Sequence, residues 1–198
     1  MVDDDRFRRA IAAIDAANAD DPNEIVVRGE PRPKELAHAE LVTEWVPRLR
    51  PDADEALLLA ARAHHLRRWA VPRSSYPEGR KGYLRWRRDL EDRHAVEAGE
   101  ILRDVGYDEA TIARVGAILR KRNLARDPDV QALEDALCLV FLETQFSDLA
   151  ARTEADQMVE ITRKTLKKMS PAGQALAVEL AAALPEADQH LVQRALAP

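Results

Sequence analysis

Histidines and carboxylates are the residues of this chain whose types and order could bind a metal ion. Four of the five histidines lie in the N-terminal half, and an apolar stretch further along carries two adjacent acids. Imidazole and carboxylate groups suit zinc, manganese and iron, and ligands from several helices commonly converge inside a helical bundle. The candidate residues are His38, His64, His65, His94, Glu134 and Asp135.

Each candidate also has a structural interpretation. His38, on the apolar side of a predicted helix, fits a hydrogen-bonded core histidine, and His94 fits an exposed position. Asp135 could simply interact with the dipole of its own helix, although a carboxylate among leucines and alanines is costly to bury unpaired. Adjacent residues on a helix point about 100° apart. His64 and His65 therefore cannot both face one point equally, and either could point inward.

A second feature is a basic and aromatic segment at residues 62–93, which holds ten basic residues against four acidic ones. Guanidinium groups bind two phosphate oxygens at once, and aromatic faces stack on nucleobases. The segment indicates a pocket for a phosphorylated, nucleotide-like small molecule, with residues 70–79 as its lid. Equally, the arginines could pair with the acidic remainder of the chain. The candidate substrate-binding residues are Arg68, Arg73, Tyr76, Arg80 and Arg85.

The elements that must position these residues are helices. Ala, Leu, Arg and Glu are abundant and aromatic residues make up only 5%, which favours helix over strand. We predict an all-α fold with helices at about 3–18, 34–49, 51–69, 82–106, 108–123, 128–144, 153–169, 171–184 and from 186 onward. Residues 20–33 form a connector in which 25–27 are a short extended piece at most.

Length and charge suggest one main domain. The chain has 198 residues, a net charge of −5 and one cysteine. We expect a helical core at residues 1–149 and a C-terminal helical appendage at 150–198 that could belong to the same domain. The acidic balance disfavours nucleic acid as a partner, and Cys138 is typical of a core residue. Residues 1–5 lack a signal-peptide core and no apolar run reaches the ~20 residues of a membrane span. We therefore expect a cytoplasmic protein with no membrane partner, whose oligomeric state the sequence does not determine.

Over residues 34–145 the order of these residues resembles the HD superfamily of metal-dependent phosphohydrolases. That family has an early histidine, a His-Asp doublet, optional later histidines and a final aspartate on a buried helix. The resemblance implies a single helical bundle of HD-like type. Because His65 replaces the doublet's aspartate and an imidazole cannot bridge two metals, it implies at most one ion, held by His38, His64 or His65, His94 and Asp135. A site that has lost its metal is the alternative.

The whole chain more closely resembles a family catalogued as domain of unknown function 4202. The segments that carry this resemblance are residues 16–18, 21–23, 32–36, 60–69, 72–77, 82–87 and 131–137. They include the string Ala-Arg-Ala-His-His-Leu-Arg-Arg-Trp at residues 61–69. The family implies no established activity.

Two main hypotheses follow. The first is a metal-dependent hydrolase of a phosphorylated small molecule, with one Mn, Fe or Zn ion that activates water, Glu134 as proton acceptor and Asp135 in the catalytic centre. Iron-dependent oxygenation is its less favoured variant. The second is a metal-free helical protein that binds an anionic ligand or an RNA end through residues 62–93. A weaker third is a partner-binding module at residues 150–198. Metal content separates the first two.

Overall fold

Helices make up most of the chain that the computed structural model describes, which is residues 4–124 and 126–197. They are α1 (Asp4–Ala19), α2 (Lys34–Leu49), α3 (Glu55–Ala63), α4 (Gly79–Asp104), α5 (Glu109–Leu119), α6 (Pro128–Thr144), α7 (Phe146–Ala150), α8 (Ala155–Leu166), α9 (Pro171–Ala181) and α10 (Glu186–Leu196). Two 3-10 turns, η1 (Arg68–Ala70) and η2 (Arg73–Ser75), lie between α3 and α4. The all-α prediction is confirmed; residue 3, where we expected the first helix to begin, lies outside the described residues.

The connector at residues 20–33 is a small antiparallel hairpin. Strand β1 (Glu24–Val27) pairs with β2 (Glu30–Pro33), and Glu24 lies opposite Pro33. Asp21 joins this hairpin to the start of α2, because its carboxylate accepts hydrogen bonds from the backbone N–H groups of Asn23 and Glu35, both at 2.9 Å. The first turn of a helix has free N–H donors and a positive dipole end. Asp21 therefore fixes where α2 begins.

Several helix ends follow the capping signals of the sequence. Asp127 accepts hydrogen bonds from N–H groups in the first turn of α6, and Pro128 occupies the first helical position. Beyond the end of α4, Gly106 has a φ of 93°, which favours glycine. The start predicted for the third helix at residue 51 is wrong, since α3 begins at Glu55 and is capped by the side chain of Asp54.

Helix α3 also ends earlier than the sequence predicts, at Ala63 instead of near residue 69. The chain then turns, and Arg67 takes a left-handed conformation with a φ of 48°. Such a conformation is uncommon for a non-glycine residue. Here the N–H of Arg67 donates to Oδ1 of the fully buried Asn18 on α1, at 3.0 Å. The adjacent histidines 64 and 65 consequently lie in a turn and not on a regular helix.

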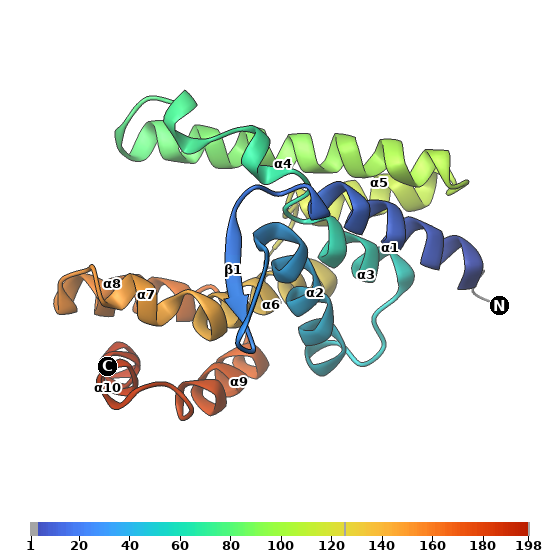
Figure 1. The fold of residues 1–198 in the computed structure, drawn as a ribbon. Coiled ribbons are helices and arrows are strands. Elements are labelled where there is room, and N and C mark those ends of the chain that lie inside the picture. Colours follow the sequence, from blue (N-terminus) through green and yellow to red (C-terminus); the bar gives the residue numbers. More distant parts are fainter. Residues whose placement is uncertain (1–3, 125, 198) are drawn as a thin grey trace.

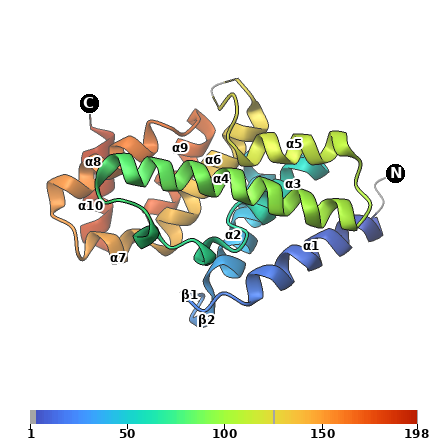
Figure 2. The same ribbon diagram turned by 90° about the horizontal axis from the view of Figure 1, so that it is seen from above.

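Helix α6 occupies the middle of the molecule. It packs against α2, α3, α5, α7 and α9, and ten of its residues are buried. Figures 1 and 2 show the N-terminal helices at one end of the molecule, α8 to α10 at the other, and α4 running along its length. One buried apolar cluster includes Leu57 of α3, Leu139 of α6 and Met158 of α8, so residues from both sides of position 149 share it. Within the described residues, no helix has the length and apolarity needed to cross a membrane.

Candidate functional site

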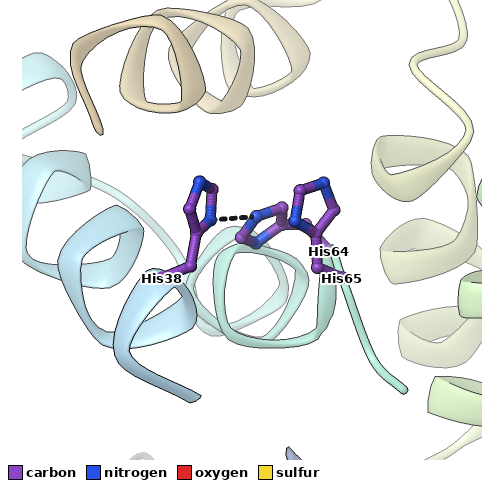
Figure 3. Close-up of side chains that lie close together, drawn as sticks. All are labelled: His38, His64 and His65. Carbon is purple, nitrogen blue, oxygen red and sulfur yellow. Dashed lines mark hydrogen bonds between the residues drawn. The ribbon is translucent and has the colours of Figure 1, made fainter. Parts of the chain in front are cut away.

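Three histidines from two segments come together beside α6. His38 lies on α2, and His64 and His65 lie in the turn after α3 (Figure 3). Each can offer one ring nitrogen such that the three atoms lie within 4.8 Å of one another. The ring centroids of His64 and His65 are 4.2 Å apart. The expectation that only one of these two could face the site fully does not hold, because the early end of α3 takes both off the helical geometry.

Hydrogen bonds fix the tautomers of His38 and His64. Nδ1 of His64 lies 2.8 Å from the carbonyl oxygen of Ala61, which can only accept, so Nδ1 carries the proton. Nε2 of a neutral His64 is then an acceptor, and Nδ1 of His38 donates to it at 3.0 Å. The Nε2 lone pair of His38 follows as the free coordination position of that ring.

His65 is held between a carboxylate and a guanidinium group. Its Nδ1 donates to Oε2 of Glu35 at 2.9 Å, and Nε2 accepts a hydrogen bond from Nη1 of Arg68 at 2.6 Å. The guanidinium of Arg68 also lies over the ring of Trp86, 4.8 Å from its centroid. Glu35 is buried, with 6% of its surface exposed. A carboxylate on the far nitrogen orients an imidazole and raises its basicity, as is usual for metal-binding histidines.

His94 enters from α4 with the same orientation. Its Nδ1 donates to the carbonyl oxygen of Leu66 at 2.9 Å, and its ring centroid is 6.1 Å from that of His65. Its exposed fraction is 2%, which contradicts the interpretation of His94 as a surface residue. All four rings thus carry their proton on Nδ1 and their lone pair on Nε2.

Burial keeps these imidazoles neutral. It lowers the pKa of His38 and that of His94 to about 4. It also lowers the pKa values of His64 and His65 well below the ordinary value, and the charge of Arg68 lowers that of His65 further. Neutral imidazole is the form that binds a metal. The donor chemistry therefore fits a divalent ion such as zinc, manganese or iron.

A four-coordinate ion would require the cluster to contract and its rings to turn. Nitrogen ligands at 2.0–2.1 Å from zinc are roughly 3.3 Å from each other in a tetrahedron, and the three ring nitrogens are up to 4.8 Å apart. An ion held by all three would also take Nε2 of His64 from His38 and Nε2 of His65 from Arg68. Rotation of imidazoles about their side-chain bonds can provide such changes.

Asp135 does not join the histidines, and this corrects the predicted ligand set. Its Oδ1 accepts a hydrogen bond from the backbone N–H of Ser170 at 3.0 Å, and its Oδ2 accepts one from the Ser170 hydroxyl at 2.5 Å. Gln131 donates to the same carboxylate. An added Cβ at Gly173 would lie 2.6 Å from Cγ of Asp135, so the carboxylate is packed under the first turn of α9. It is buried and satisfied there as a structural group.

Glu134 does face the histidine side of α6, but it is not free to accept a proton. Lys121 donates to its Oε2 at 2.5 Å and Lys168 to its Oε1 at 3.0 Å. Burial alone would raise the pKa of Glu134, but the two ammonium groups outweigh this and lower it to about 2. A carboxylate with so low a pKa is a poor general base at neutral pH. The predicted role of Glu134 as proton acceptor is therefore not supported.

Two cavities meet at the histidines. The first, the α6 cavity, has a volume of about 300 Å³; it includes all four histidines and a wall of Leu133, Leu137, Cys138 and Phe141 from α6. The second, the loop cavity, measures about 480 Å³ and is lined by Trp69, Val71, Pro72 and Arg73. His38, His65, Arg68 and Gln145 border both. Arg68 thus stands where the two cavities adjoin.

Of the predicted substrate-binding residues, Arg68 alone lines the α6 cavity. Arg73 borders the loop cavity, but its guanidinium donates to the carbonyl oxygens of Tyr76 and Pro77. The hydroxyl of Tyr76 donates to Asp89, and Arg85 lies 3.7 Å from the same aspartate. Arg80 is exposed on α4. Arg73 and Arg85 therefore find their partners within residues 62–93 and not in the acidic remainder of the chain.

Sequence reasoning missed Glu35, Lys121 and Lys168. Glu35 stands three residues before His38 on α2. Because residues i and i+3 share a helix face, this spacing could have indicated that Glu35 lies near the histidines. Lys121 and Lys168 follow the ends of α5 and α8, and their sequence neighbourhoods are ordinary. No sequence pattern placed them near Glu134, because only the packing of three helices does so.

Comparisons with known proteins place the chain in one family. The family model described as "Domain of unknown function (DUF4202)" matches residues 8–192. No curated protein matches the chain, and no solved structure does.

Proposed function

Because the chain belongs to the DUF4202 family, whose description names no activity, we propose a function from the site itself: metal-dependent hydrolysis of a phosphate ester of a small molecule. The observation that carries it is the cluster of neutral imidazoles on His38, His64 and His65, all buried or half-buried at the wall of a cavity. A divalent ion bound there would act as a Lewis acid and activate a water for attack on phosphorus.

The chain's own residues support this assignment in two ways. Glu35 and the carbonyl oxygen of Ala61 hold the Nδ1 protons of His65 and His64, which presents lone pairs to an ion. His94 lies beside His65 with its Nε2 also deprotonated and lines the same cavity. It is the fourth candidate ligand beside His38, His64 and His65. An HD-like origin of the bundle remains part of this proposal.

Arg68 supplies the phosphate-binding charge. When His65 binds an ion, Arg68 must release Nε2, and its guanidinium then has donors for a phosphoryl oxygen. Burial lowers the pKa of Arg68, yet a guanidinium stays charged near neutral pH. Arg68 therefore occupies the site when no substrate is present. When substrate is bound, it would stabilise the negative charge of the phosphoryl group.

Metal content tests the proposal directly. We expect mass spectrometry of untagged full-length protein to find near-stoichiometric manganese, iron or zinc, and His65→Ala to lose it. His190→Ala is the matched control, since His190 is exposed on α10. The loaded protein should then hydrolyse members of a phosphomonoester panel. Protein that binds none of these ions after reconstitution would eliminate the hydrolase.

A second candidate is a metal-free protein that binds an anionic ligand. The hydrogen bond from Arg68 to Nε2 of His65 favours it, because it satisfies the ring without an ion. An RNA end is the macromolecular version of such a ligand, and its affinity should fall linearly on a log–log plot against salt concentration. Tight binding of a small anion by chelator-treated protein, with no metal uptake, would favour this candidate over the hydrolase.

A further inference from the structure

The wall of the α6 cavity carries a second cluster of charges besides the histidines. Lys121 follows α5, Glu134 lies on α6 and Lys168 follows α8, so three separate segments meet at one carboxylate. Glu134 is buried, with 4% of its surface exposed. The side chains of Lys121 and Lys168 are 18% and 44% exposed. The cluster is thus shielded on its acidic side and open on the side of Lys168.

This cluster has an excess of positive charge. Two ammonium groups share one carboxylate, and the nearby Arg87 and Glu91 offset each other at 3.6 Å. Over the whole lining of the α6 cavity, four cationic side chains stand against two acidic ones, in a protein whose net charge is −5. Burial raises the pKa of Cys138 to about 11, so its thiol adds no negative charge. A positive excess beside apolar walls is best compensated by an anion.

The lysines also have donors to spare. An ammonium group has three N–H donors, and the hydrogen bonds among the described residues give each of these lysines one partner, Glu134. An incoming oxyanion could therefore bind both without displacing Glu134. The α6 side of the same cavity supplies apolar side chains, which include Leu133, Leu137 and Phe141.

We propose that the α6 cavity binds a small amphipathic anion, with its oxyanion between Lys121 and Lys168 and its apolar body along α6. Lys121, Lys168 and the four histidines line the same cavity, so one ligand could reach both clusters. Resting on the proposed function, the substrate class is a phosphate ester whose leaving group is a short apolar chain ending in a second oxyanion. A cavity of about 300 Å³ is at the small end of ligand sites.

Calorimetric titration of chelator-treated, full-length protein with octanoate tests this subsite without any metal. We expect octanoate to bind and octanol, which has the same chain but no charge, to bind far more weakly. Lys168→Gln should weaken octanoate binding about tenfold or more. Lys167→Gln, at an exposed neighbouring position, should leave it unchanged. Octyl phosphate in a parallel titration distinguishes a phosphate from a carboxylate preference.

A second variant should change octanoate affinity in the opposite direction. Glu134→Gln removes the competing internal carboxylate while preserving its shape, so octanoate should bind more tightly to it than to the parent. If octanoate binds the parent and Lys168→Gln equally, binds no better than octanol, or fails to bind at millimolar concentrations, the subsite is wrong. Because these titrations contain no metal, their failure is separate from a failure of the metal and hydrolysis measurements.

Discussion

Oε2 of Glu35 lies 2.9 Å from Nδ1 of His65, and both groups face the cluster from different segments of the chain. This contact fixes the proton of His65 on Nδ1. We expect Glu35→Gln to weaken metal binding roughly 10–100-fold, because an amide orients the ring less well and no longer raises its basicity. Competition with a chelator measures this. Glu44→Gln, at an exposed position on α2, is the control, and equal affinities for both variants would contradict the assigned role.

Arg68→Gln should change metal binding and catalysis in opposite directions. The guanidinium occupies Nε2 of His65 at 2.6 Å, so its removal should raise metal affinity roughly tenfold. The same variant should lower kcat/KM for a phosphate ester by about 100-fold, because one charged donor to the transition state is lost. Arg80→Gln on the exposed face of α4 provides the comparison. A parallel fall in both quantities would mean that Arg68 mainly holds the site together.

Asp135→Ala should destabilise the fold and leave metal content intact. The substitution removes the acceptor for the N–H and hydroxyl of Ser170, and unsatisfied buried donors cost about 1–3 kcal/mol each. Urea denaturation measures the loss, with Asp156→Ala as the control because that carboxylate is 93% exposed. Loss of metal from a folded Asp135→Ala protein would restore Asp135 to the ligand set.

Stability of the metal-free protein should fall as the pH drops from about 6.5 to about 4. Burial lowers the pKa of His38 and that of His94 to about 4, so in this window the unfolded chain binds protons that the folded chain excludes. The stabilisation is complete above the histidine pKa of the unfolded chain and is lost as the pH falls to the pKa of the folded protein. Each histidine accounts for on the order of 3 kcal/mol.

Urea midpoints measured at pH 7, 6, 5 and 4.5 would follow this loss. The stabilisation from the Glu134 carboxylate is lost only at lower pH than this range, because its pKa in the folded protein is about 2. His94→Gln should flatten the curve, whereas His190→Gln should not. A midpoint that stays constant down to pH 4.5 would show that the buried rings are protonated in the fold.

The sequence predicted the helices well because their signals are local. Asp127-Pro128 at the start of α6 and Gly106 after α4 depend on residues next to the helix end. The end of α3 was mispredicted because its cause is distant: Asn18 on α1 accepts the N–H of Arg67, 49 positions away. Hydrophobic periodicity through residue 69 could not reveal that contact.

The sequence also indicates which residue types the site contains, but not which distant segments contact them. His38, His64 and His65 lie close together, whereas Asp135 and Glu134 occupy adjacent positions with different surroundings. Asp135 faces α9 through Ser170, and Glu134 faces Lys121 and Lys168. An apolar stretch predicts that a carboxylate on it needs a partner, but it does not say which segment supplies that partner.

The hydrogen bond between Asn18 and the N–H of Arg67 means that α1 helps to hold the turn that carries His64 and His65. In a mutational scan scored on the proposed metal-dependent activity, position 18 should therefore rank with the histidines themselves, although it lies on a different segment from any of them. Substitutions on the exposed side of α1, which does not include the buried Asn18, should be nearly silent. A map of tolerated changes would then show Asn18 as sensitive as the buried Ala10 and Ile14 of the same helix, although Asn18 acts through a hydrogen bond to the histidine turn and not through apolar packing.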